Sequence, residues 1–349
     1  MHRSSKIRRR SFAAVAALMA SGAVVPVIRA QPRAEDAKLS IGVGGKTAFH
    51  CLPLVLALQL GYFKAEGLDV AITDFPDEAS ALQALTTGSM DVVSGAYEHT
   101  INLQGKGQSL QSIVLQSRVP QIAVGVSSRN LPGLKALSEL RGARIGISAT
   151  GSSTQSVAST VLLRAGLTGS DVTFLAVGMG AGALSALRSG QIDVISNVEP
   201  VMTMLEHKGE VRVIADTRTL KGTQEVFGGY MPTGCLCAPI EFVQGHPGTC
   251  QALANAMVRA LKWLRTAGPG DLFKAVPESF LLGDRGLYLT SFNKVAEAYS
   301  LDGLMPEEST RTALRALSAL DPSVRAARVD LASTFTNEFA RRAKNRFKA

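Results

Sequence analysis

The chain has 349 residues, of which 46% are hydrophobic, so it can bury a large core and is long enough for about two domains. This composition excludes an intrinsically disordered protein. The formal net charge is +9, but six of the 37 Lys and Arg residues lie within residues 1–30, which contain no Asp or Glu. The remaining 31 basic and 28 acidic residues leave a charge of only +3, so we expect no nucleic-acid partner.

Residues 1–30 have the three parts of a secretory signal peptide. A basic start is followed by the apolar stretch Ala13–Ile28 and by small residues ending at Ala30. The stretch is shorter than the roughly 20 residues that span a bilayer, and no lipid-attachment motif precedes a cysteine. We therefore expect an exported, soluble, periplasmic protein. The run Arg9-Arg10-Ser11-Phe12 fits the twin-arginine pattern, which leaves that route and the general secretory route both open.

An internal repeat organises the rest of the chain. Residues 81–94 recur as residues 183–196, and the run 40–43 recurs as 144–147. Each copy of the longer run has the pattern of a short apolar helix, a glycine that stops it, and a buried strand. The sequence therefore predicts two copies of one α/β unit.

Strands and helices alternate within each predicted unit. In chain order, the elements of the first unit are 39–43, 53–64, 69–73, 78–87 and 91–94, beginning and ending with a strand. Those of the second unit are 143–147, 154–165, 172–177, 181–189 and 191–196. Alternation of this kind is typical of parallel strands joined by right-handed crossovers. We predict an α/β fold with two open parallel-sheet lobes.

Two segments are expected to connect the lobes. Strand 122–126 is predicted to be the first crossing, and strand 211–215 with its following loop the return. Lobe 1 is then 38–124 plus 218–349, and lobe 2 is 125–217. After the return we expect a strand at 234–238, helices near 247–267, 287–299 and 307–317, and a C-terminal helix from about Ala332, all packed on lobe 1. Two crossings make a hinge about which lobes can close on a ligand.

The loops that follow the strands are the candidate ligand contacts, because open parallel sheets bind ligands beyond the carboxyl ends of their strands. The strongest is 148–154, which precedes a helix and offers free backbone N–H groups as well as hydroxyls. Helix capping explains the same serines without a ligand. The contacts predicted in this loop are Thr150, Gly151, Ser152 and Ser153.

Other strand ends supply further candidates. The loop after the first strand contributes Lys46, Thr47, Phe49 and His50, although a lone Lys or His in a loop is usually only solvated. The loops after the repeated strands contribute four more, namely Tyr97, Glu98, Asn197 and Glu199. Tyr97 is suited to stack on a planar solute, and Glu199 to accept from an amine or a ring N–H. Asp77 and Met179 are weaker candidates, because turn and cap duties explain them adequately.

The same residues offer little for catalysis. Glu98 and Glu199 would be an acid/base pair, but no nucleophile or cofactor motif accompanies them. We therefore expect no catalytic residue and no cofactor.

The four cysteines do not have the spacing of a disulfide framework or of a zinc finger. Cys235 and Cys237 lie about 6.8 Å apart along a strand, which is beyond easy bridging. Pairing of Cys250 with either of them stays open. We expect the cysteines to be small buried hydrophobes, and no metal site.

The run Pro53–Val70, with its core Gly61-Tyr62-Phe63-Lys64-Ala65-Glu66-Gly67-Leu68-Asp69-Val70, resembles the nitrate/sulfonate/taurine and thiamine-pyrimidine type of periplasmic binding proteins. Further matches are Gly151–Thr154, Glu199-Pro200, Pro232–Gly234 and Thr336–Phe339. The resemblance covers nearly all of the mature chain. It implies a type II periplasmic-binding-protein fold and delivery of a solute to an ABC permease at the inner membrane.

The same family has an enzyme branch, the eukaryotic pyrimidine-precursor synthases, in which a lysine four residues before a histidine carries the chemistry. Here His99 is in place, but Gly95 stands where the lysine would be. Without that amine there is no Schiff-base route. We therefore expect a monomeric, non-enzymatic protein that binds a small organic anion or zwitterion, a sulfonate or carboxylate that can be aromatic. The alternatives are binding of a thiamine-pyrimidine precursor, a pyrimidine-synthase-like enzyme of the same fold, and a solute sensor.

Overall fold

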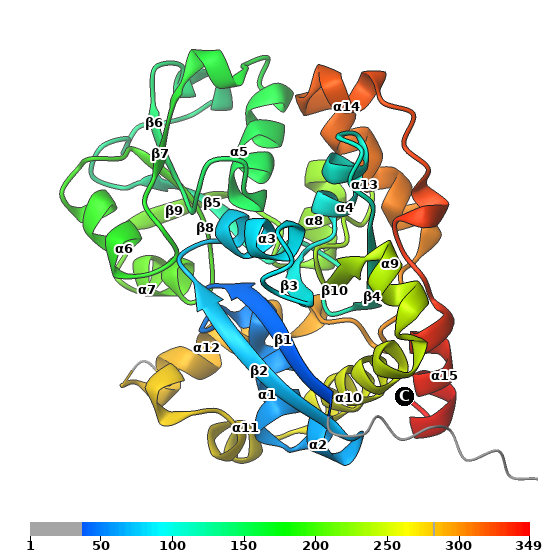
Figure 1. The fold of residues 1–349 in the computed structure, drawn as a ribbon. Coiled ribbons are helices and arrows are strands. Elements are labelled where there is room, and N and C mark those ends of the chain that lie inside the picture. Colours follow the sequence, from blue (N-terminus) through cyan, green and yellow to red (C-terminus); the bar gives the residue numbers. More distant parts are fainter. Residues whose placement is uncertain (1–36, 282) are drawn as a thin grey trace, which may run out of the picture. The chain divides into compact units, whose positions relative to one another are not determined.

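The computed structural model describes residues 37–281 and 283–349, and the predicted signal peptide lies outside them (Figure 1). Two five-stranded sheets are present in this part of the chain. The first has the order β2-β1-β3-β10-β4, and the second the order β7-β6-β8-β5-β9. The strands of the first sheet are β1 Ala37–Gly44, β2 Leu68–Phe75, β3 Val92–Ala96, β4 Leu110–Leu115 and β10 Gly234–Pro239. Those of the second are β5 Ile122–Ser127, β6 Arg144–Ile147, β7 Thr173–Ala176, β8 Val194–Val198 and β9 Val211–Asp216.

Both sheets have the same layout, as the repeat predicts. Strand β1 pairs in parallel with β2 and β3, and β6 pairs in parallel with β7 and β8. The sheets are nevertheless mixed, because β10 runs antiparallel between β3 and β4, and β5 antiparallel between β8 and β9. Each sheet therefore receives its antiparallel strand directly after the chain has crossed from the other sheet.

The crossings differ from the prediction. Strand 122–126 is not a crossing segment but β5 of the second sheet, so the predicted boundary after residue 124 falls inside a strand. The chain passes from the first sheet to the second within 116–121, and it returns after β9 through 217–233.

Equivalent aspartates of the repeat fix the start of equivalent strands. Asp91 Oδ2 accepts hydrogen bonds from the backbone N–H and the hydroxyl of Ser40, at 2.8 and 2.7 Å. Asp193 Oδ2 accepts from the backbone N–H of Arg144 at 3.0 Å, and the Arg144 guanidinium forms a salt bridge with the same carboxylate. The repeated Asp thus ties β3 to β1 and β8 to β6, which sets the register of both sheets.

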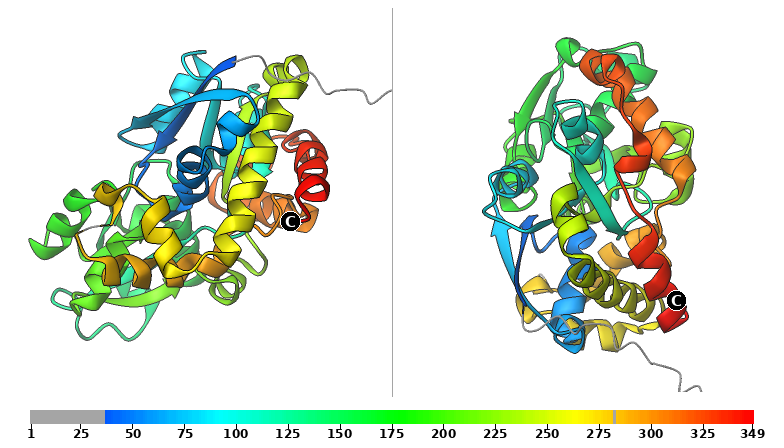
Figure 2. Two further views of the ribbon diagram at one scale, coloured as in Figure 1. Left: turned by 90° about the horizontal axis from the view of Figure 1, so that it is seen from below. Right: turned by 45° about the vertical axis from the view of Figure 1, so that its right-hand side comes forward.

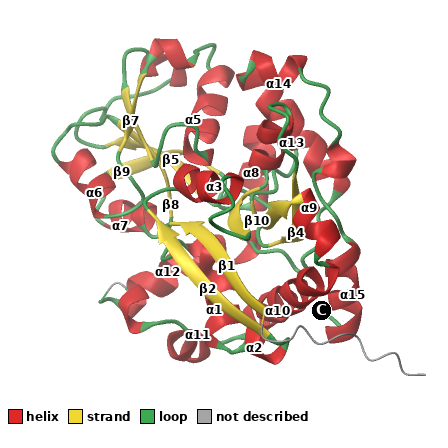
Figure 3. Ribbon diagram, in the orientation of Figure 1, coloured by secondary structure: helices red, strands yellow, loops and turns green. Residues whose placement is uncertain are grey.

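Helices cover both sheets (Figure 3). The helices that precede β10 in the chain are α1 Leu52–Gln59, α2 Tyr62–Ala65, α3 Glu78–Thr86, α4 Glu98–Gln104, α5 Ser153–Arg164, α6 Ala181–Arg188, α7 Val201–His207 and α8 Leu220–Phe227. The predicted helix 53–64 is broken in two because Gly61 adopts a left-handed conformation, with φ of 69°, between α1 and α2.

The C-terminal helices are α9 Ile240–Gly245, α10 Pro247–Thr266, α11 Pro269–Ala275, α12 Arg285–Val295, α13 Glu307–Leu320, α14 Pro322–Ala326 and α15 Glu338–Phe347. Helix α10 packs along α1 and α15 over the first sheet (Figure 2). Contrary to the prediction, the C-terminal helices do not all pack on the first lobe alone. Helix α12 contacts α7 and helix α13 contacts α5, and both α7 and α5 belong to the second lobe. The last helix begins at Glu338, six residues after the predicted start at Ala332, since residues 334–337 pair with β4 and with Met305 instead.

Candidate ligand-binding site

A narrow cavity of about 30 Å³ lies where the two sheets approach each other. The parallel strands β1 and β3 of the first sheet and β6 and β8 of the second end at this place, and the arrowheads of β1 and β2 point toward the second sheet (Figure 1). The residues that line it are Gly44, His50, Glu78, Gly95, Ala96, Pro120, Ile122, Ser148, Ser152, Ser153, Thr154, Met179, Val198, Thr233 and Gly234. One cavity among the described residues therefore lies where the site was predicted, beyond the strand ends and between two lobes.

Glu78 brings a carboxylate into this cavity from the first turn of α3. Its Oε1 accepts a hydrogen bond from the backbone N–H of Ala96 and lies 3.4 Å from Nε2 of His99. Burial raises the pKa of Glu78, but the nearby charge of His99 and the N–H of Ala96 outweigh that effect, so the pKa lies below its usual value. Glu78 is thus held as an anion at neutral pH.

The two histidines near Glu78 differ in charge. Burial lowers the pKa of His50, and the nearby Glu78 only partly opposes this, so its imidazole is neutral at pH 7. Burial also disfavours the charged form of His99, but Glu78 more than compensates and raises the pKa of His99 to about 9. The Glu78–His99 pair is therefore an ion pair, while His50 offers the cavity a neutral ring.

The start of α5 forms the opposite wall. Ser152 is the N-cap, and its hydroxyl accepts from the backbone N–H of Gln155 at 3.4 Å. The hydroxyl of Thr154 is 2.9 Å from that of Ser148 and 2.7 Å from that of Ser152. Ser153 differs from these neighbours, because its Oγ is buried and no described residue meets it in good hydrogen-bonding geometry. A charged group close to it is the buried Glu98 carboxylate, whose pKa the Ser153 hydroxyl lowers against the raising effect of burial. A buried hydroxyl without a partner is costly, so this oxygen is free to bind a ligand.

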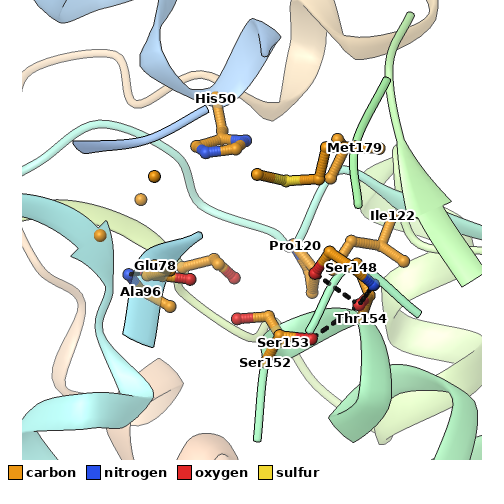
Figure 4. A pocket seen from close by; sticks show the side chains of 15 residues that line it. His50, Glu78, Ala96, Pro120, Ile122, Ser148, Ser152, Ser153, Thr154 and Met179 are labelled. Carbon is orange, nitrogen blue, oxygen red and sulfur yellow. Dashed lines mark hydrogen bonds between the residues drawn. The ribbon is translucent and has the colours of Figure 1, made fainter. Parts of the chain in front are cut away.

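Met179 closes the cavity from the second lobe. It follows β7, and its side chain reaches across to the loop after β1 in the first lobe, where a Cβ on Gly45 would lie 2.5 Å from the methionine methyl. Figure 4 shows Glu78, Ser153, His50 and Met179 pointing into one space from different sides. Four of the predicted contacts line the cavity, namely His50, Ser152, Ser153 and Met179.

Three of the predicted contacts in the loop after β1 lie outside the cavity lining. Phe49 packs in the core, with its ring centroid 4.8 Å from that of Tyr288. Thr47 is exposed, and Lys46 donates its backbone N–H to Asp74 Oδ1 at 2.9 Å. The structure thus places Phe49 in the core beside α12 and not in the lining of the cavity.

Tyr97, Asn197 and Glu199 also lie outside the lining of the cavity. Tyr97 is fully buried, and its hydroxyl lies 2.5 Å from that of Thr334. The amide of Asn197 donates to the carbonyl of Gly178 at 2.9 Å and accepts from the N–H of Val198. Glu199 is 1% exposed and pairs with the buried Arg218 at 2.5 Å. These polar side chains are buried and satisfied by the protein itself.

Four other predicted contacts also lie outside the lining of this cavity. Asp77 caps α3 by accepting from the N–H of Ser80. Glu98 is buried beside α5, where its Oε1 accepts from the hydroxyl of Ser156 at 3.3 Å, and burial raises its pKa. Thr150 and Gly151 line a second and larger hollow of about 430 Å³ that also touches Lys106 and Asp321. We place the site in the smaller cavity because its walls carry the converging carboxylate and the unpartnered hydroxyl.

Several lining residues were missed from the sequence. Glu78 lies in the first turn of a helix, where an acidic residue is ordinarily explained by the helix dipole. Ser148 and Thr154 belong to the predicted loop but were not singled out, and Thr233 and Pro120 come from the two crossings. The one signal for Glu78 was its place after the second strand, next to Asp77.

The family model described as NMT1/THI5 like matches residues 48–267, which is more than half of the chain. The chain belongs to the NMT1/THI5-like family. Among solved structures, the chain is similar to that of a protein from Bordetella bronchiseptica RB50. The two are 53% identical, with a TM-score of 0.86, and the match covers 90% of this chain and 99% of that one.

A further solved structure shares the fold of this NMT1/THI5-like protein. The alkanesulfonate-binding protein SsuA from Xanthomonas axonopodis pv. citri bound to MOPS is 22% identical, with a TM-score of 0.68 and coverage of 87% of this chain and 99% of that one. At this identity the likeness shows the fold alone, and it agrees with the predicted two-lobed periplasmic-binding-protein architecture.

Two curated relatives of the NMT1/THI5-like chain match only in part. One is the 4-amino-5-hydroxymethyl-2-methylpyrimidine phosphate synthase of Schizosaccharomyces pombe, at 25% identity over 219 residues. The other is a putative aliphatic sulfonates-binding protein of Escherichia coli, at 28% identity over 156 residues. The chain covers 60% of the first and 47% of the second, so their activities do not carry over to it directly.

Membrane-spanning helices and metal-binding clusters are both absent among the described residues. No helix within 37–281 and 283–349 has the length and apolar character needed to cross a membrane. In the same ranges, no group of three or more His, Cys, Asp or Glu side chains is placed to hold a metal ion.

Proposed function

We propose that this protein is the exported, periplasmic solute-binding component of an ABC importer and that it carries a small zwitterion in the cavity between its two sheets. The observation that supports this most is that an anionic group and a hydrogen-bonding hydroxyl at a helix N-terminus face each other across one cavity. Glu78 presents an anionic carboxylate on one side, and the unpartnered Ser153 hydroxyl at the start of α5 faces it from the other.

The charges of the lining favour a zwitterion over a simple organic anion. The lining residues include no Lys or Arg, and Glu78 would repel an anion. The N-terminal end of α5 nevertheless favours a negatively charged or accepting group, because first-turn N–H groups and the helix dipole point toward it. A solute with an ammonium or N–H donor at Glu78 and an acceptor group at α5 would satisfy both walls.

Capture would depend on closure of the lobes. The cavity has only about 30 Å³, and Met179 of one lobe already reaches Gly45 of the other. A cavity of this size has room for only about two water molecules. We infer that the lobes part by bending at the two crossings, 116–121 and 217–233, to admit the solute, and that they then close over it around a wider cavity than the one described. In this proposal a monomer presents the closed form to an ABC permease.

A binding role fits the site better than an enzymatic one. Gly95 is in the cavity wall and supplies no amine, and none of the lining side chains is a cysteine or lysine nucleophile. The partial match to a pyrimidine phosphate synthase supports one alternative ligand, an aminopyrimidine, whose amino group would face Glu78 in the same way.

Thermal unfolding of the purified protein with a panel of small solutes tests the proposal. The panel contains taurine and MOPS as zwitterions, ethanesulfonate as an anion, ethylamine as a cation, and 4-amino-5-hydroxymethyl-2-methylpyrimidine. A solute at 100 times its dissociation constant adds about 2.7 kcal/mol of stability. We expect a zwitterion to give the largest shift. A shift by the pyrimidine with its consumption would favour the enzyme, and a shift by ethanesulfonate alone would contradict the assignment of Glu78.

A further inference from the structure

Two thiols lie next to each other in β10, directly behind the cavity wall. The sulfur atoms of Cys235 and Cys237 are 3.1 Å apart, and both side chains are buried. Residues two apart on a regular strand have Cα atoms about 6.8 Å apart, at the far limit for a disulfide. The pairing of β10 with β4 shifts register between Leu236 and Cys237. Because an irregularity of this kind bends a strand, it accounts for the close approach of the two thiols.

The other two cysteines provide an internal comparison. All four are free and buried. Cys51 and Cys250 belong to the core between the first sheet, α1 and α10, whereas Cys235 and Cys237 belong to the core cluster that includes Tyr97 and residues of the second lobe. Cys51 and Cys250 are therefore as buried as Cys235 and Cys237 but lie in a different part of the core.

We propose that Cys235 and Cys237 form a disulfide within β10 when the chain folds in the presence of a disulfide oxidant such as oxidised glutathione. The thiolate of one cysteine attacks the oxidant, which releases one glutathione thiol and leaves a mixed disulfide. The second cysteine thiolate then displaces the other glutathione. The cysteines lose two protons and two electrons, and one oxidised glutathione becomes two reduced molecules.

The position of the pair connects it to the cavity. In the register of the sheet, Cys235 is opposite Gly95 and Gly234 is opposite Ala96, and Gly95, Gly234 and Ala96 all line the cavity. The Cys235 thiol also donates to the carbonyl of Gly95 at 3.6 Å, a contact that ends when the disulfide forms. The hydrogen bond with Cys235, together with burial, raises the pKa of the Cys237 thiol. Thiolate attack is therefore slow in the closed protein and faster in a chain that is still folding.

Refolding in a glutathione redox buffer tests the inference on the full chain. Protein unfolded in urea is refolded with oxidised and reduced glutathione, free thiols are blocked with iodoacetamide, and the product is cleaved after glutamate. The fragment 226–241 then contains Cys235 and Cys237 and no other cysteine. We expect this fragment to lack two hydrogens and to carry no alkyl group, and to become doubly alkylated after reduction.

Matched variants distinguish a disulfide between Cys235 and Cys237 from oxidation of any of the four cysteines. The double variant Cys51→Ser with Cys250→Ser is expected to give the same unalkylated fragment, and Cys235→Ser is expected to leave Cys237 alkylated. A doubly alkylated fragment 226–241 in the refolded wild type would overturn the inference, as would a disulfide that joins either residue to Cys51 or Cys250. The test uses no ligand, so its outcome is independent of the proposed function.

Discussion

Glu78 occupies the space that a side chain at position 95 would need. A Cβ atom on Gly95 would lie 2.6 Å from Oε1 of Glu78, the atom that accepts the N–H of Ala96. The absence of a side chain at position 95 therefore allows a carboxylate from α3 to reach the end of β3 and to enter the cavity.

Replacement of Gly95 by alanine should displace this carboxylate. The added methyl group forces Glu78 away from Ala96 and His99, which we expect to lower the free energy of unfolding by about 1–3 kcal/mol. Urea unfolding measures the change. Gly133→Ala is the matched control, because a Cβ there meets no atom within 4 Å, and its effect should stay within about 0.5 kcal/mol. Equal effects of the two substitutions would contradict the packing of Glu78 against Gly95.

The Glu78–His99 ion pair predicts a pH dependence of stability. Folded His99 keeps its proton up to about pH 9, whereas the unfolded chain releases it near the ordinary pKa of 6.5. The stabilisation is therefore complete below about pH 6.5 and is lost as the pH rises to about 9. Unfolding free energies measured across this interval should fall by on the order of 1–3 kcal/mol.

Two variants check the source of that slope. Glu78→Gln removes the partner that holds the proton on His99, so the slope should largely disappear. His207→Gln, an exposed histidine outside the site, should leave it unchanged. A slope that persists in Glu78→Gln would mean that another group is responsible.

The two serines at the start of α5 should respond in opposite ways. Ser152→Ala removes the N-cap of α5 and should cost about 0.5–2 kcal/mol of stability. Ser153→Ala removes a buried hydroxyl that has no partner in the described part of the chain, so the free protein should be at least as stable as wild type. Stabilisation by a bound solute should instead decrease in Ser153→Ala. Loss of unfolding free energy in ligand-free Ser153→Ala would show that this hydroxyl has a structural partner.

Glu199 should behave as half of a buried ion pair. Arg218 is 3% exposed and also contacts Glu206 and Asp216, so Arg218→Ala leaves Glu199 without its charge partner in the interior. We expect a loss of about 3–5 kcal/mol in urea unfolding. Arg311→Ala, which breaks the exposed pair with Glu307, should change stability by less than about 1 kcal/mol. Similar losses in the two variants would refute the structural role given to Glu199.

The fold was more predictable than the site, for a physical reason. Repetition of residues 81–94 as 183–196 preserves the spacing of helix, glycine and strand, and this spacing determines local structure. A strand at 234–238 was predicted, but the antiparallel pairing of β10 could not be, because its partners β3 and β4 lie more than a hundred residues earlier in the chain.

To predict which residues line the site, the direction of each side chain must be known. The loops that hold His50, Ser152 and Met179 were identified because strand ends are ligand sites in such sheets. Whether a side chain in such a loop faces the cavity or the interior depends on distant partners. Glu199 points inward because it pairs with the buried Arg218, and Tyr97 does so because its hydroxyl hydrogen-bonds with that of Thr334.

The central claim is that the narrow cavity between the two sheets holds a small zwitterion. A crystal structure of the protein with the solute that gives the largest thermal shift tests it most directly. We predict electron density for the solute between Glu78, Ser153 and Met179, with its amino group at the carboxylate. Density in the larger hollow beside Thr150 and Asp321, with the inner cavity empty, would contradict the claim.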